Sequence, residues 1–174
     1  MKKLIFTSYA IIIASIFLFS CTKDPIYVSY VTPDKEVCLT GTTAYDYVSK
    51  EFPIDHADVA ALVTADQLDN ISSIMLKSGV KVQVSTSGYN LDQISSIELY
   101  LKEKDATGLG QQIAYSDPIG LGATEVNMQL NGVNVKDMAT KDMTMTVKVL
   151  NKSGGNTPVC LKLTSSTFEI KITP

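Results

Sequence analysis

The sequence contains no tryptophan and a single histidine, and no stretch of it gathers charges of one sign. The absence of a basic patch, in a chain with a formal net charge of −3, argues against nucleic acid as a partner. With one histidine, any Ser–His or Cys–His mechanism must use His56, and no Gly-x-Ser-x-Gly turn supplies the serine. Without tryptophan, tyrosines are the rings on which a bound sugar could stack.

Two short glycine motifs could suggest a phosphate-binding loop: Gly108-Leu109-Gly110 and Gly120-Leu121-Gly122. Neither continues as Gly-x-Gly-x-x-Gly, and neither opens a long helix, so both are predicted to be turns. No cofactor is expected.

Acidic residues lie close to His56 in the sequence. Asp55 and Asp58 flank it, which makes a small metal site conceivable, but a helix cap explains the same residues. Carboxylate pairs of the kind used in glycoside hydrolysis could come from Glu51, Asp55 and Asp58, or from Glu98 and Glu103. Glu98 alternates with apolar neighbours, which is typical of the solvated face of a strand. We therefore expect neither a catalytic nor a metal site.

The first twenty residues have the layout of a secretory signal peptide. Lys2 and Lys3 precede the uncharged, apolar stretch 4–20, and the polar segment 22–25 follows. A basic start, an apolar run and a small residue at the cut are typical of export. The alternative is an uncleaved N-terminal anchor helix, because the stretch lies at the short end of the spanning range.

The end of this segment, Leu18-Phe19-Ser20-Cys21, resembles a lipobox, the recognition site of the lipoprotein signal peptidase. The resemblance implies cleavage between Ser20 and Cys21 and lipidation of Cys21, by a diacylglycerol and usually an amide-linked third chain. Several acyl chains hold a protein to a membrane far more firmly than one does. On this interpretation residues 1–20 are a signal peptide, 21–35 a lipidated tether and linker, and 36–174 the folded domain.

If lipid occupies Cys21, two cysteines remain, Cys38 and Cys160. An even number in an oxidising compartment makes them a candidate disulfide. Two free buried thiols are the alternative, because sequence does not show whether the side chains come within reach.

Apolar and polar residues alternate along most of the chain, which indicates half-buried strands. The clearest runs are 80–84, 97–101, 126–130, 143–149, 159–163 and 168–172. They are separated by turn signals and are too closely spaced for parallel crossovers, so an antiparallel β-sandwich of about seven to nine strands is predicted, of an immunoglobulin-like or Greek-key type. One short helix is expected to begin near Asp55, and a closed barrel is the second choice.

Several of these segments resemble a broad group of small lipoproteins of the Bacteroidota. The similar elements are Ile94–Leu101, Ile113–Tyr115, a strand beginning at Thr124, and the closing Phe168–Ile170. The resemblance implies a β-sandwich in the cell envelope and no particular activity. Lys23-Asp24 resembles the signal that sends such lipoproteins to the outer face, which leaves a periplasmic and a cell-surface location open.

These observations predict an outer-membrane lipoprotein that is not an enzyme. Its sandwich domain is expected to bind another envelope component. A glycan is the alternative ligand, with Tyr45, Tyr47 and Tyr100 as a candidate platform. An envelope hydrolase is the remaining alternative.

Overall fold

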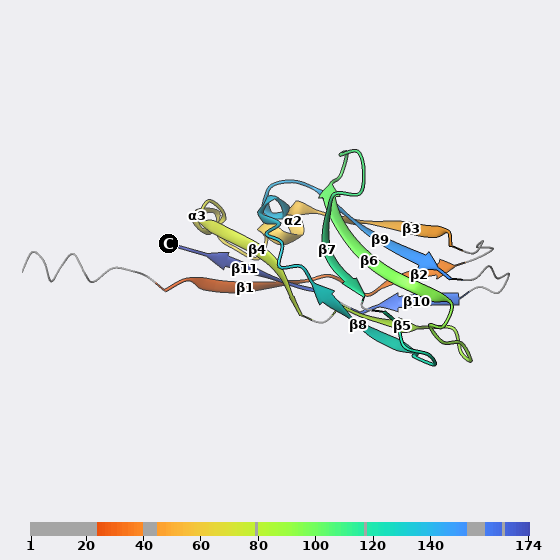
Figure 1. The fold of residues 1–174 in the computed structure, drawn as a ribbon. Helices are drawn as coiled ribbons and strands as arrows, with labels where there is room; N and C mark the ends of the chain where they lie inside the picture. Colours follow the sequence, from red (N-terminus) through yellow and green to blue (C-terminus); the bar gives the residue numbers. More distant parts are fainter. Residues whose placement is uncertain (1–23, 40–44, 79, 117, 153–158, 165) are drawn as a thin grey trace, which may run out of the picture.

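The computed structural model describes residues 24–39, 45–78, 80–116, 118–152, 159–164 and 166–174 (Figure 1). The predicted signal peptide, the cleavage site at Ser20 and the lipidation site at Cys21 lie outside the described residues. Within them, no helix has the length and apolar content needed to cross a bilayer.

The described residues form eleven strands, two short α-helices and a 3-10 helix. The strands are β1 (Ile26–Val31), β2 (Lys35–Leu39), β3 (Tyr47–Ile54), β4 (Ile71–Ser78), β5 (Lys81–Val84), β6 (Ile94–Glu103), β7 (Gln111–Ser116), β8 (Glu125–Leu130), β9 (Met143–Asn151), β10 (Val159–Leu163) and β11 (Thr167–Ile172). The helices are α2 (His56–Ala60), α3 (Ala65–Leu68) and the 3-10 helix η1 (Lys136–Ala139).

The strands form two antiparallel sheets, with the orders β1-β11-β4 and β2-β10-β5-β8-β7-β6-β9-β3. The small sheet continues the large one, because β1 leads into β2, β4 into β5 and β10 into β11 (Figure 1). At the break beside β1, the amide of Thr32 donates to the carbonyl of Ser166 at 2.9 Å. Three pairs of strands that are consecutive in the chain therefore each have one member in the small sheet and one in the large sheet.

The large sheet curls until its two edge strands approach each other. Lys50 of β3 donates from Nζ to the carbonyl of Glu36 on β2 at 3.0 Å. The ammonium groups of Lys35 and Lys50 also lie 5.4 and 5.6 Å from the ring centroid of Phe52. The prediction of a mostly antiparallel β fold is confirmed, and its layers give it both a sandwich-like and a barrel-like character.

Burial follows the alternation seen in the sequence. On β6, Ile97, Leu99 and Leu101 are buried, while Glu98 and Tyr100 between them face outward and are half-buried. Removing such apolar side chains from water stabilises the fold by about 1.5–3 kcal/mol for each large one. The core thus fixes which residues each strand presents to solvent.

The structure corrects the sequence interpretation in two details. There are more strands than the seven to nine expected, and two short α-helices where one was expected. The second, α3, begins at a capping box in which Thr64 and Gln67 satisfy each other's backbone amides. Within the segment 21–35, residues 26–31 have strong β propensity and form β1, which pairs along its whole length with β11.

Candidate functional site

The outer surface of β3, β9 and β6 carries two of the three predicted platform tyrosines. In the register of these strands, Glu51 lies opposite Thr146, which in turn lies opposite Tyr100. Tyr47 stands four residues before Glu51 on β3, so alternation directs it to the same side. We call this surface, with Tyr47, Glu51, Glu98, Tyr100, Lys102 and Lys148, the Tyr47 face.

Tyr47 is half exposed and has a cation over its ring. The Nζ atom of Lys148, on the neighbouring strand β9, lies 3.7 Å from the ring centroid. The negative face of an aromatic ring attracts such an ammonium group. One side of the ring is therefore already engaged, and a ligand would stack on the other side or displace the lysine.

Tyr100 is held by polar neighbours on the same face. Its hydroxyl donates to Oε2 of Glu98 at 2.9 Å and accepts from Nε2 of Gln112 at 3.4 Å. Burial raises the pKa of Tyr100 above its ordinary value, and the hydrogen bond to Glu98 raises it further. The hydrogen bond from Gln112 acts in the opposite direction and lowers the same pKa.

An ion pair crosses β9 between the two outer strands of this face. Lys102 Nζ on β6 lies 2.9 Å from Glu51 Oε1 on β3, and the lysine side chain is only 13% exposed. Thr146 lies on β9 between these strands and is buried at 2% exposure. Among the described residues its hydroxyl has no hydrogen-bond partner. The Tyr47 face thus presents charged and aromatic side chains to solvent, with the unpaired hydroxyl of Thr146 buried beneath them.

Tyr45, the third predicted platform residue, lies in the turn before β3. Its backbone has a positive φ of 63°, and its amide donates to the carbonyl of Asn151 at 2.9 Å. The ring is 76% exposed. The structure therefore brings Tyr47 and Tyr100 onto one sheet surface and leaves Tyr45 outside the strand register.

His56 is paired with an aspartate that the sequence analysis did not consider. Its Nδ1 lies 2.7 Å from Oδ1 of Asp142, which precedes β9, and its amide donates to the same oxygen at 3.3 Å. This hydrogen bond raises the pKa of His56 and lowers that of Asp142. No spacing rule could have linked residues so far apart in the chain.

The expected helix cap is present beside this pair. Asp55 accepts a hydrogen bond from the amide of Ala57 at 2.8 Å, as an N-cap does. The ligand atoms of Asp55, His56 and Asp142 lie within 4.8 Å of one another, so they could reach a common cation. However, Asp55 serves the cap, and Lys104 Nζ lies 3.6 Å from Asp142. Asp58, the other predicted neighbour, is not part of this group.

The remaining candidate carboxylates have separate partners. Glu51 pairs with Lys102 and Glu98 accepts from Tyr100, as described above. Glu103 pairs with Lys141 Nζ at 2.6 Å, and the same ammonium lies 3.7 Å from Asp137. Each of these carboxylates thus belongs to a network of ion pairs and hydrogen bonds at the surface.

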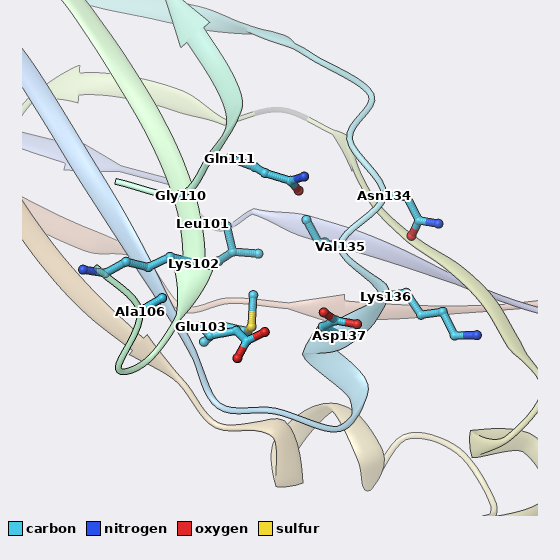
Figure 2. Close-up of a pocket in the computed structure, with 11 residues that line it drawn as sticks. Leu101, Lys102, Glu103, Ala106, Gly110, Gln111, Asn134, Val135, Lys136 and Asp137 are labelled. Carbon is cyan, nitrogen blue, oxygen red and sulfur yellow. The ribbon is translucent and has the colours of Figure 1, made fainter. Parts of the chain in front are cut away.

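A cavity of about 360 Å³ lies where β6 ends, β7 begins and η1 passes (Figure 2). Leu101, Val135 and Met143 contribute apolar walls, and the carboxylates of Glu103 and Asp137 approach from opposite sides. The sequence analysis did not predict it.

One glycine shapes the same cavity. Gly110 has a positive φ of 83°, and a Cβ there would collide with the backbone of Leu101 and lie 2.6 Å from Cβ of Lys102. Only glycine lets the chain approach β6 this closely. The predicted turn at Gly108–Gly110 is thus also a wall of the cavity.

No protein-family model matches the chain, and no curated protein matches it. Among solved structures, the chain is similar to a structure of tobacco necrosis virus, with 11% sequence identity and a TM-score of 0.32. The match covers 87% of this chain and 88% of the viral chain. The chain is also similar to a structure of Desmodium yellow mottle tymovirus, with 11% identity, a TM-score of 0.28, and coverage of 88% and 91%. Similarities this low carry no information about function.

Proposed function

We propose that this chain is a membrane-anchored envelope lipoprotein whose β-sandwich domain binds another envelope component without catalysing a reaction. The lipobox-like sequence ending at Cys21 motivates the anchor. The observation that carries the envelope location is the disulfide between Cys38 and Cys160, register partners on β2 and β10. Such bonds form and persist in oxidising compartments outside the cytosol.

The anchor can be tested in a Gram-negative host that expresses the full chain. The parent chain is expected in the membrane fraction, with an N-terminal peptide that begins at Cys21 and carries the mass of acyl groups. Cys21→Ser should accumulate as uncut precursor without that mass. Cys38→Ser is the matched control, because it removes a cysteine and leaves the lipobox intact. A Cys21→Ser chain that is processed and fractionates like the parent would refute the proposal.

Glycan binding at the Tyr47 face is a second candidate, favoured by the placement of Tyr47 and Tyr100 on one sheet surface. Rings with neighbouring carboxylates and ammonium groups offer both the stacking surface and the polar partners that a sugar requires. The disulfide does not discriminate between a protein and a glycan as the ligand.

An array of polysaccharides, probed with a chain that begins at Thr22 and so carries neither signal peptide nor lipid, tests this candidate. Tyr47→Ala should weaken any hit by about tenfold, since a stacked ring is worth about 0.5–1.5 kcal/mol beyond its buried area. Tyr27→Ala is the matched control, because Tyr27 is similarly exposed but lies on the other sheet. An array without hits, or equal losses in both variants, would exclude this face as the sugar site.

A further inference from the structure

The three-stranded sheet has an open outer surface close to the start of β1. In its register, Tyr27 of β1 lies opposite Lys171 of β11, which lies opposite Ser73 of β4. A shallow hollow of about 450 Å³ lies on this surface. We call its lining the Tyr27 face: Tyr27, Ser73, Met75, Lys77, Glu169 and Lys171.

The other side of this sheet is packed against the protein. Phe168 and Ile170 of β11 are buried, and the ring centroid of Tyr30 lies 6.3 Å from that of Phe168. Strand alternation therefore turns Tyr27 away from the core, and the residue is 55% exposed.

The charge of the Tyr27 face differs in sign from that of the chain as a whole. It carries two ammonium groups and one carboxylate, and Lys77 Nζ lies 3.2 Å from Glu169 Oε1. That pairing leaves Lys171 as the excess positive charge, in a chain with a net charge of −3. A ring beside a lysine is the combination that proteins place at membrane interfaces.

Chain length limits how far this face can lie from the proposed anchor. Only residues 22–25 separate Cys21 from Ile26, the first residue of β1. Fully extended, the chain between those Cα atoms covers at most about 18 Å. The surface of the bilayer that holds the lipid would then lie within that distance of β1.

We propose that the Tyr27 face rests on the phospholipid surface that holds the acylated Cys21, with the Tyr27 ring in the headgroup region and the Lys171 ammonium near the phosphates. This inference rests on the proposed lipid anchor. The Tyr47 face lies on β3, β9 and β6 of the other sheet (Figure 1) and would remain open to a partner.

Charge favours this orientation over an end-on one, in which the end of the small sheet where β1 begins would face the membrane. The end of the small sheet where β1 begins also holds the loop after α3, since the amide of Thr173 donates to the carbonyl of Asn70 at 3.0 Å. Asp66 and Asp69 are exposed there. An end-on domain would press these carboxylates against anionic headgroups, which repel them, whereas the Tyr27 face offers a net positive charge.

The absence of tryptophan makes a direct test available. The lipidated full chain, as Tyr27→Trp or Tyr47→Trp, is reconstituted in vesicles of phosphatidylethanolamine and phosphatidylglycerol that carry a quencher at headgroup depth. The indole of Tyr27→Trp is expected to lose about half of its emission or more, because an interfacial side chain lies within about 5–10 Å of that depth. Tyr47→Trp is the matched control and is expected to lose little. Adding Lys171→Glu to Tyr27→Trp should reduce the quenching by roughly half.

A parallel sedimentation assay separates failure of this inference from failure of the anchor. If the lipidated parent chain sediments with vesicles and a chain that begins at Thr22, without signal peptide or lipid, does not, the anchor holds. Equal quenching of the two tryptophan variants would then overturn the orientation alone. Chain-to-chain cross-links through the Tyr27 face would overturn it as well, since a second copy would occupy the surface. If the chain that begins at Thr22 sediments like the parent, both proposals fail.

Discussion

Removing the disulfide should destabilise the domain mainly through its effect on the unfolded chain. Cys38 is exposed and Cys160 is half-buried, so replacing both with serine removes little packing. The bond spans a sequence separation of 122 residues. In the chain-entropy model, opening a loop of that length costs about 5 kcal/mol at 25 °C.

That loss is large beside the stability of ordinary domains, which is about 5–15 kcal/mol. For a domain of this length, a loss of about 5 kcal/mol corresponds to a fall of roughly 10–20 °C in Tm. The double variant Cys38→Ser/Cys160→Ser is therefore expected to be marginal at 37 °C.

Guanidinium titration followed by circular dichroism measures the effect. Both chains carry Cys21→Ser, so that no third thiol can exchange with the pair. The denaturant slope m is expected to be larger without the bond, because a chain free of the cross-link exposes more surface on unfolding. The bridged chain treated with reductant should reproduce the double variant.

Two results would refute this reasoning. A loss below about 1.5 kcal/mol with unchanged m would mean that the bond does not restrict the unfolded chain. A large loss in the serine variant that reductant does not reproduce would place the effect in folded-state packing.

Other contacts are testable one at a time. The Asp142 hydrogen bond raises the pKa of His56, so an NMR titration should place this pKa above about 6.5, and Asp142→Asn should return it toward that value. Because the pKa of His56 is higher in the folded state, the stability gained from this pair is complete below the unfolded-state pKa and is lost as pH rises through the folded-state pKa. A domain that becomes more stable across that pH range would contradict the pairing of His56 with Asp142. Gly110→Ala combines a positive φ with a backbone collision and should cost more than about 2 kcal/mol in thermal unfolding, whereas Gly120→Ala, which meets open space, should cost less than about 0.5 kcal/mol. Thr146→Val should raise the free energy of unfolding by about 1 kcal/mol, since its buried hydroxyl has no partner in the described part of the chain; a loss would indicate that water satisfies it.

The strands could be predicted from sequence because apolar and polar side chains alternate along most of them. On β9, Val147 and Val149 alternate with outward positions, and the same alternation on β6 carries Leu99 and Leu101. A period of two is a local property, so it survives without knowledge of the partner strands. The placement of Tyr47 and Tyr100 on outer positions follows from it.

Contacts that depend on strand order could not be predicted in this way. Glu51 and Lys102 meet because β3 and β6 both pair with β9, and no local pattern encodes that order. His56 meets Asp142 for the same reason, since β9 begins directly after Asp142. The flanking Asp55 was the visible partner in sequence. Its Oδ1 caps the helix and lies 3.6 Å from His56 Nδ1, farther than Asp142.

The anchor and the disulfide together set how far the domain can move from a membrane. If Cys21 is lipidated, a pull on the anchor acts first on β1. Its pairing with β11 and the packing of Val28 and Tyr30 against the core hold β1 to the domain. Loss of that pairing would lengthen the tether from about 18 Å to about 60 Å, the reach of an extended chain up to Cys38. It would lengthen no further while the domain stays folded, because the bond to Cys160 joins β2 to β10 covalently. The disulfide thus stabilises the fold and, on the proposed anchoring, also limits the distance at which the Tyr47 face can meet a partner.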